Sequence, residues 1–205
     1  MNYPGAGPGR NRVQVRHFLL PGIVWAAALF TAPFLNGDGG AALLWGAGAA
    51  VLVGLFPAVL IAGLQRRSDL RGSLGLPLPP VVTATAAMGF TAQWAILWLN
   101  GPLALSAVLF GLLGTALILL AGARIRLLSW TGLSCGAGAV ILPVLLWNLA
   151  AGLPVPAAAA AVLALLAAVV AGLARTRGWK AALVSGAAGA AAGGGVFLWL
   201  LGYAG

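Results

Sequence analysis

Seven long apolar stretches, separated by short connections, account for most of this chain. They cover residues 18–35, 41–64, 80–99, 103–123, 127–149, 155–174 and 180–202. A helix that crosses a bilayer needs about 20 mostly apolar residues, and each stretch is too long for a membrane strand. Helices also satisfy their own backbone hydrogen bonds in lipid. The pattern predicts an all-α, polytopic membrane bundle of about seven transmembrane helices.

Every second connection has the composition of a tight turn. Residues 36–40, 100–102 and 152–154 combine Gly with Asn or Pro, which mark turns. We therefore expect three antiparallel hairpins, from the first six stretches taken in pairs. Pro57 and Pro143 lie inside apolar stretches and are expected to kink their helices.

The remaining connections, together with the segment before the first stretch, carry all eleven cations of the chain. These residues are Arg10, Arg12, Arg16, Arg66, Arg67, Arg71, Arg124, Arg126, Arg175, Arg177 and Lys180. Cytoplasmic loops of membrane proteins are enriched in Lys and Arg, so the asymmetry predicts a cytoplasmic N-terminus in a multi-pass protein of the cell membrane. Residues 1–15, rich in Gly and Pro, are expected to form a flexible cytoplasmic tail before a single transmembrane domain over 16–205.

Composition agrees with a membrane protein and excludes an ordinary soluble one. Hydrophobic residues make up 62% of the chain and charged residues 6%, against about a quarter in soluble domains. The net charge of +9 is then better explained by anionic lipid headgroups at the helix ends than by nucleic acid. Membrane lipids are the expected partners, and no nucleic acid is expected.

The inventory of reactive side chains is small. His17 is the single histidine, Glu is absent, and Asp38 and Asp69 fall on opposite sides of the expected membrane. Paired-histidine metal sites, Ser-His-Asp triads and paired catalytic carboxylates are therefore excluded. Cys135 is alone, so no disulfide is expected. From the residues alone we predict no metal site and no cofactor.

Small and polar residues inside the apolar stretches allow two interpretations. Thr83, Thr85, Thr91 and Gln93 give the third stretch an unusual polar content, which fits either bridges between helices or the lining of a pocket, with Thr91 and Gln93 as lining residues. The run Gly186, Gly189, Gly193, Gly194 and Gly195 is expected to pack closely against another helix. Trp98, Trp130, Trp147 and Trp179 are expected to anchor the helices at the two interfaces.

Eight of the cations belong to the three cytoplasmic loops between helices. If those loops converge over one mouth of the bundle, a phosphate or headgroup site would form from Arg66, Arg67, Arg71, Arg124, Arg126, Arg175, Arg177 and Lys180. Arg side chains match phosphate oxygens in geometry and charge. The alternative is that these residues only set the membrane orientation.

Several segments resemble the UbiA-type family of intramembrane prenyltransferases. Residues 76–79, Leu-Pro-Leu-Pro, are similar to the family's Arg-Pro-Leu-Pro, and Asp69 aligns with the last Asp of its Asn-Asp-x-x-Asp-x-x-x-Asp motif. Residues 101–105 are similar to its Gly-Pro-Leu-Ala-Leu turn, and Arg126 takes the place of a Lys. The other motif positions hold Ile61, Ala62 and Gln65, and the second Asp-rich loop, here 175–180, has no acid. The resemblance covers about residues 15–202, with two of the family's nine helices missing.

The resemblance implies prenyl transfer, which uses magnesium held by carboxylates. One Asp69 among Arg66, Arg67 and Arg71 cannot build a two-metal site. We therefore expect a non-catalytic relative that binds a prenyl or other lipid, or acts as a membrane subunit of a complex. Two alternatives stay open: an active prenyltransferase with magnesium and catalytic Asp69, completed by a partner chain, and a small-solute transporter.

Overall fold

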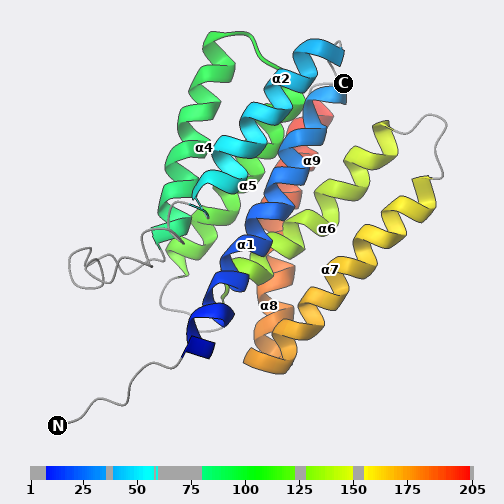
Figure 1. Cartoon of the computed structure of the whole chain (residues 1–205). Helices are drawn as coiled ribbons and strands as arrows, with labels where there is room; N and C mark the ends of the chain where they lie inside the picture. The colour runs from blue at the N-terminus through cyan, green and yellow to red at the C-terminus, as the bar shows by residue number, and fades with distance from the viewer. Residues whose placement is uncertain are drawn as a thin grey trace.

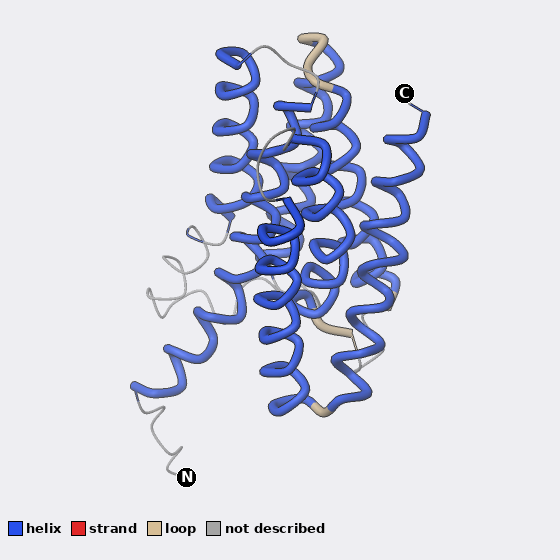
Figure 2. Tube along the Cα trace, turned by 90° about the vertical axis from the view of Figure 1, so that its right-hand side faces the viewer, coloured by secondary structure: helices blue, strands red, loops and turns tan. Residues whose placement is uncertain are grey.

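The structure is a bundle of roughly parallel and antiparallel helices (Figures 1 and 2). The computed structural model describes residues 8–35, 39–57, 59, 80–122, 128–149 and 155–203, and its regular elements there are all helical. In order they are α1 (Pro8–Thr31), the 3-10 helix η1 (Ala32–Leu35), α2 (Gly39–Ala49), the π-helix η2 (Ala50–Leu55), α4 (Pro80–Trp98), α5 (Leu103–Ala121), α6 (Trp130–Leu149), α7 (Val155–Arg177), α8 (Trp179–Gly189), the π-helix η4 (Ala190–Gly194) and α9 (Gly195–Tyr203).

These helices alternate in direction along the chain. In Figure 1, α1, α4, α6 and the α8–α9 segment run from the lower to the upper end, and α2, α5 and α7 run back. The three predicted hairpin pairs are therefore antiparallel. The helix ends that adjoin the basic connections lie at the lower end of the bundle.

The turn between α4 and α5 is fully described and follows from its sequence. Asn100 has a φ of 51°, a left-handed conformation that Asn tolerates better than most residues. The Gly101 amide donates to the Ile96 carbonyl at 2.8 Å, and Pro102 precedes the first residue of α5 with a φ of −64°. The prediction of a tight turn at 100–102 is confirmed.

The centre of the bundle is formed by α5 and α6. Their fully buried side chains include Leu105, Leu109, Leu112, Leu133, Ile141 and Leu145. Trp25 of α1 and Phe197 of α9 are also buried against this centre. The helices α2 and α4 lie on one side of it, and α7 lies on the other (Figure 1).

The glycine run of the last segment packs in backbone contact with α5 and α6. A Cβ atom at Gly189 would overlap the Leu133 carbonyl, and one at Gly193 would overlap Thr115 Oγ1. From the other side, a Cβ at Gly136 would overlap the Gly186 carbonyl. Only glycine allows this approach, so the predicted close packing of the glycine run is confirmed.

Both π-helices coincide with a local feature of the sequence. Pro57 has no amide hydrogen and its ring collides with the carbonyl four residues earlier, so a widened turn at η2, just before it, relieves the conflict. The second, η4, contains Gly193 and Gly194, where the segment is in contact with α5 and α6. Pro143, by contrast, lies inside α6, which is assigned as helix from Trp130 to Leu149.

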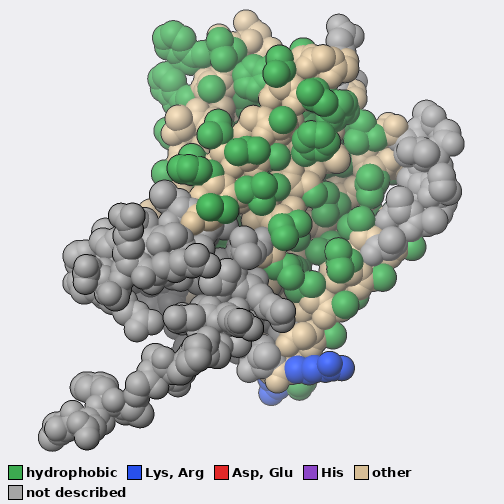
Figure 3. Space-filling model, in the orientation of Figure 1, with side chains coloured by type: hydrophobic (Ala, Val, Ile, Leu, Met, Phe, Trp, Pro, Cys, Tyr) green, Lys and Arg blue, Asp and Glu red, His purple; other side chains and the backbone are tan. Residues whose placement is uncertain are grey.

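Hydropathy and surface composition both indicate a membrane protein. Three helical segments are long and apolar enough to cross a bilayer, namely Leu103–Ala121, Trp130–Leu149 and Trp179–Gly202. The described surface is covered with apolar side chains (Figure 3), among them Leu44 and Trp98 at 74% and 76% exposure. Soluble monomers rarely expose such continuous apolar area. Shorter apolar helices are found at Leu20–Leu35, Gly39–Leu55 and Val162–Gly172.

Two expectations need correction. Helix α1 begins at Pro8, so the second half of the tail predicted over 1–15 is helical, and residues 1–7 lie outside the described part. Trp130, expected at the membrane interface, is buried in the core at 7% exposure. Trp98, Trp147 and Trp179 are exposed, as anchoring would require.

Candidate functional site

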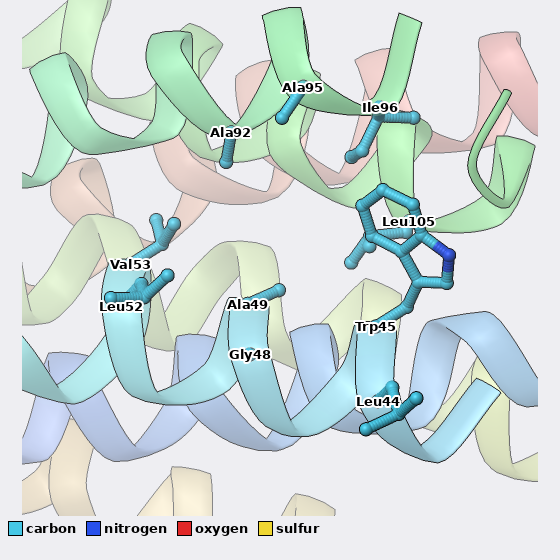
Figure 4. Close-up of a pocket in the computed structure, with 10 residues that line it drawn as sticks. All are labelled: Leu44, Trp45, Gly48, Ala49, Leu52, Val53, Ala92, Ala95, Ile96 and Leu105. Atoms are coloured by element: carbon cyan, nitrogen blue, oxygen red, sulfur yellow. The ribbon is translucent and has the colours of Figure 1, made fainter. Parts of the chain in front are cut away.

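The described structure contains an apolar groove of about 380 Å³ that opens on one side of the bundle. It runs between α2–η2 and α4, with α5 behind it (Figure 4). We call it the α2–α4 groove. Its lining residues are Leu44, Trp45, Gly48, Ala49, Leu52, Val53, Ala92, Ala95, Ile96 and Leu105.

Small side chains on the two facing helices leave the space open. Gly48 and Ala49 form the middle of the α2 wall, and Ala92 and Ala95 lie on the α4 wall (Figure 4). A Cβ atom added at Gly48 would meet nothing within 4 Å. The opposing walls are therefore too far apart for small residues to close the gap.

Larger side chains close the two ends of the groove. At the end near the α4–α5 turn, the Trp45 indole extends toward Leu105 and Ile96 (Figure 4). Its ring carbons would lie 3.1 Å from a Cβ at Gly101. At the other end, Val53 approaches α4, where a Cβ at Gly89 would lie 3.8 Å from it. The groove is thus bounded at its two ends and open along one side.

The groove has the chemistry of a hydrocarbon site. Nine of its ten lining residues have no polar side-chain atom, and the tenth, Trp45, carries only an indole N–H. Such walls offer nothing to a phosphate, a metal ion or a polar solute, because those groups need charged or hydrogen-bonding partners. Throughout the described chain, no group of three or more His, Cys, Asp and Glu side chains could hold a metal ion.

The two predicted pocket residues lie outside this groove. Thr91 is exposed, and its hydroxyl donates to the Ala87 carbonyl one turn earlier, at 3.0 Å. Gln93 is buried at 4% exposure, and its Nε2 donates to Ser106 Oγ of α5 at 2.5 Å. Of the two interpretations of the polar third stretch, the bridge between helices is the one that Gln93 adopts.

One atom of this bridge has no hydrogen bond. Gln93 Oε1 is buried and has no partner among the described residues. An amide can be turned to exchange its oxygen and nitrogen, but one of the two atoms then still lacks a partner. The bridge therefore holds α4 and α5 together at the cost of one unsatisfied polar group.

Two further polar contacts join helices elsewhere in the bundle. Trp25 Nε1 of α1 donates to Ser134 Oγ of α6 at 3.0 Å. The Ser129 amide, just before α6, donates to Ser185 Oγ of α8 at 3.0 Å. Buried polar side chains of membrane helices commonly act in this way. The sequence pattern did not single out these serines, since isolated Ser and Trp residues recur throughout the chain.

The described cations of the predicted phosphate site lie at one end of the bundle, and the Trp45 end of the groove lies toward the other end. Arg175 and Lys180 are exposed on either side of the α7–α8 turn, at the lower edge of Figure 3. Lys180 Nζ lies 5.9 Å from the centroid of the Trp179 ring. Arg177 ends α7, but its side chain lies outside the described ones.

The rest of the predicted phosphate site lies outside the described residues. This applies to Arg66, Arg67, Arg71, Arg124 and Arg126, and also to Asp69, the catalytic candidate. The convergence of eight cations over one mouth stays a prediction. Fold and surface define a helical membrane protein with a lateral apolar groove.

Comparisons of the chain with protein families, with characterised proteins and with solved structures found no match. The α2–α4 groove and the exposed cations are therefore the observations from which a function can be argued.

Proposed function

We propose that this chain is a non-catalytic, multi-pass protein of the cell membrane that holds the hydrocarbon chain of a prenyl or other lipid in the α2–α4 groove. It crosses the membrane seven times, with its N-terminus in the cytoplasm. The single observation that carries the proposal is the apolar slot of about 380 Å³, closed at both ends and open on one side.

The position and size of the groove support a hydrocarbon ligand. Two of its own lining residues, Leu44 and Leu52, are exposed apolar side chains, so its open side faces lipid in a membrane. Its volume is near the lower end of the roughly 300–1,000 Å³ found for ligand pockets. One chain fits, and the headgroup of the same lipid stays outside.

Selection in this groove rests on shape. Moving a methylene group from water into an apolar site gains about 0.8 kcal/mol, but a chain that arrives from lipid gains none of this. What remains is packing, at about 0.1–0.2 kcal/mol for each pair of atoms in contact. A chain that fills the slot between Trp45 and Val53 is favoured over one that leaves gaps.

The groove supports binding rather than catalysis. Its lining residues carry no ionisable side chain. The active prenyltransferase alternative depends on Asp69 and on carboxylates from a partner chain. Prenyl diphosphate and magnesium, supplied to the purified protein, should give no product. Turnover that disappears in Asp69→Ala would overturn the non-catalytic proposal.

Lipid probes with a photoactivatable group on the chain test the groove directly. In nanodiscs, prenyl and straight-chain probes should label peptides from α2 and α4, and Gly48→Leu should reduce this labelling at least tenfold by filling the slot. Gly195→Leu is the matched control, because a Cβ at Gly195 also meets nothing within 4 Å and α9 does not line the groove. Labelling spread evenly over all apolar helices, or unaffected by Gly48→Leu, would exclude a specific site.

Cysteine labelling tests the membrane crossing. Asp38→Cys should react with an impermeant reagent from outside the cell, and Arg67→Cys only after the membrane is opened. Cys135 is buried and should give little background. The reverse pattern would overturn the proposed orientation without affecting the groove.

A further inference from the structure

We propose that the turn between α7 and α8 is a second lipid site, which binds the phosphate of an anionic phospholipid through Arg175 and Lys180. It lies on different helices from the α2–α4 groove and does not depend on it. The ligand here is recognised by its headgroup, and the ligand of the groove by its chain.

The backbone places the two cations on either side of a one-residue connection. Helix α7 ends at Arg177, helix α8 begins at Trp179, and Gly178 alone connects them. Gly178 has a φ of 92°, which favours glycine and makes this abrupt reversal possible. Its amide donates to the Ala174 carbonyl at 2.9 Å, and its carbonyl accepts from the Ala182 amide at 3.2 Å. Backbone hydrogen bonds therefore tie the turn to both helices, and Arg175 and Lys180 lie on either side of it.

The protein supplies almost no anion to pair with these cations. No Asp or Glu occurs after Asp69, so α6, α7, α8 and η4 contain no acid. Asp38 and Asp69 are the only acids against eleven cations, which leaves a net charge of +9. Arg175 and Lys180 are both exposed. Charge complementarity therefore points to an anion from outside the chain.

Neighbouring side chains place that anion at the membrane surface. Trp179 is 63% exposed at the first residue of the candidate span Trp179–Gly202, the position where interfacial Trp residues occur. One turn further, Leu183 and Val184 are 57% and 42% exposed. A cationic turn next to an exposed apolar surface matches a lipid, with its phosphate on the cations and its acyl chains along α8.

The start of α8 adds a smaller attraction for the same anion. No side chain caps this eleven-residue helix. Its first amide groups point toward the turn, and the helix dipole is positive there. Both effects favour a phosphate next to Lys180.

Competition between lipids tests this site. Native mass spectrometry of the full chain, with phosphatidylglycerol and phosphatidylcholine as probes, should detect at least one preferentially bound phosphatidylglycerol. Each Lys or Arg near an anionic surface contributes about fivefold to affinity. The double variant Arg175→Gln with Lys180→Gln should therefore lower the affinity for phosphatidylglycerol by about 30-fold. The double variant Arg175→Lys with Lys180→Arg keeps the charge and should lower the affinity for phosphatidylglycerol less than threefold.

The control for net charge is Arg10→Gln with Arg12→Gln, which removes two cations from α1. It should leave the preferential lipid bound. An equal loss of affinity in the two double Gln variants would show a general effect of net charge and would overturn a site at the turn. If Arg175→Gln with Lys180→Gln changed the affinity for phosphatidylglycerol less than twofold, the proposed site would also be overturned. Displacement of the lipid by millimolar inorganic phosphate would mean that the site binds free phosphate instead.

Discussion

The two sides of the bundle use the same small residues with opposite results. Around η4, glycines bring α6 and the last segment into backbone contact, as at Gly189 and Leu133. Around η2, Gly48, Ala49 and Ala95 face a hollow. We refer to these as the closed side and the open side.

The difference shows that a small residue is informative only together with what lies opposite. On the closed side, the atoms across the contact are the Leu133 carbonyl at Gly189 and the Thr115 side chain at Gly193, and both leave no room for a Cβ, so the surfaces fit. On the open side, both walls are small but separated, and the end residues Trp45 and Val53 hold them apart. The predictions below test this distinction, from the largest expected effect to the smallest.

The strongest test is a single methyl group on the closed side. Gly189→Ala places a Cβ against the Leu133 carbonyl, and the backbone cannot move aside cheaply, so we expect a loss of about 3 kcal/mol in unfolding free energy, the upper end of the typical cost of overpacking. The readouts are the yield of monodisperse protein and the unfolding transition in mixed micelles. Gly186→Ala, where the added Cβ meets nothing within 4 Å, should be neutral or stabilising by up to about 1 kcal/mol. Equal losses in both variants would contradict the close contact.

On the open side, removing the residue that closes the groove should have an intermediate effect. Trp45 is half-buried, so Trp45→Ala should cost about 2 kcal/mol, less than the 3–5 kcal/mol of a fully buried aromatic residue. It should also speed the exchange of a bound lipid probe, because one end of the groove becomes open. Unchanged exchange in a stable variant would mean that Trp45 does not retain the ligand.

The hydrogen bond from α1 to α6 adds a polar contact on the other face of α6 to this comparison. Trp25→Phe removes the N–H that donates to Ser134 Oγ and should cost about 1 kcal/mol beyond the change in side-chain volume. A double-mutant cycle with Ser134→Ala isolates this part. A coupling energy below about 0.3 kcal/mol would mean that the contact adds no stability.

The smallest change is expected at Gln93. Its Nε2 bridges to Ser106, but its Oε1 is buried without a partner among the described residues, so gain and loss nearly cancel. Gln93→Leu should shift the unfolding free energy by less than about 1 kcal/mol in either direction. A loss above about 2 kcal/mol would show that Oε1 has a partner in the membrane, such as water or a lipid group.

Hydropathy alone was sufficient to predict that the chain is helical, although only three of the seven predicted spans are long and apolar enough in the described residues, and Asn100 with Gly101 predicted the turn between α4 and α5. The faces of the helices could not be predicted, because core and lipid are both apolar and the residue period then carries little information. Trp98 and Trp130 illustrate this: both looked interfacial, but one is exposed and the other buried. The groove depends on the distance between two helices, which no local pattern of residues encodes.

The contact between Trp25 and Ser134 also sets an order of events during synthesis. The two residues are 109 positions apart in the chain. At about 5–20 residues per second, the ribosome needs roughly 5–20 s to add Ser134 after Trp25. Helix α1 is therefore synthesised seconds before its partner residue exists. During that interval the indole N–H has to bond with water, lipid headgroups or other proteins, and it becomes a bridge between helices only once α6 has been made.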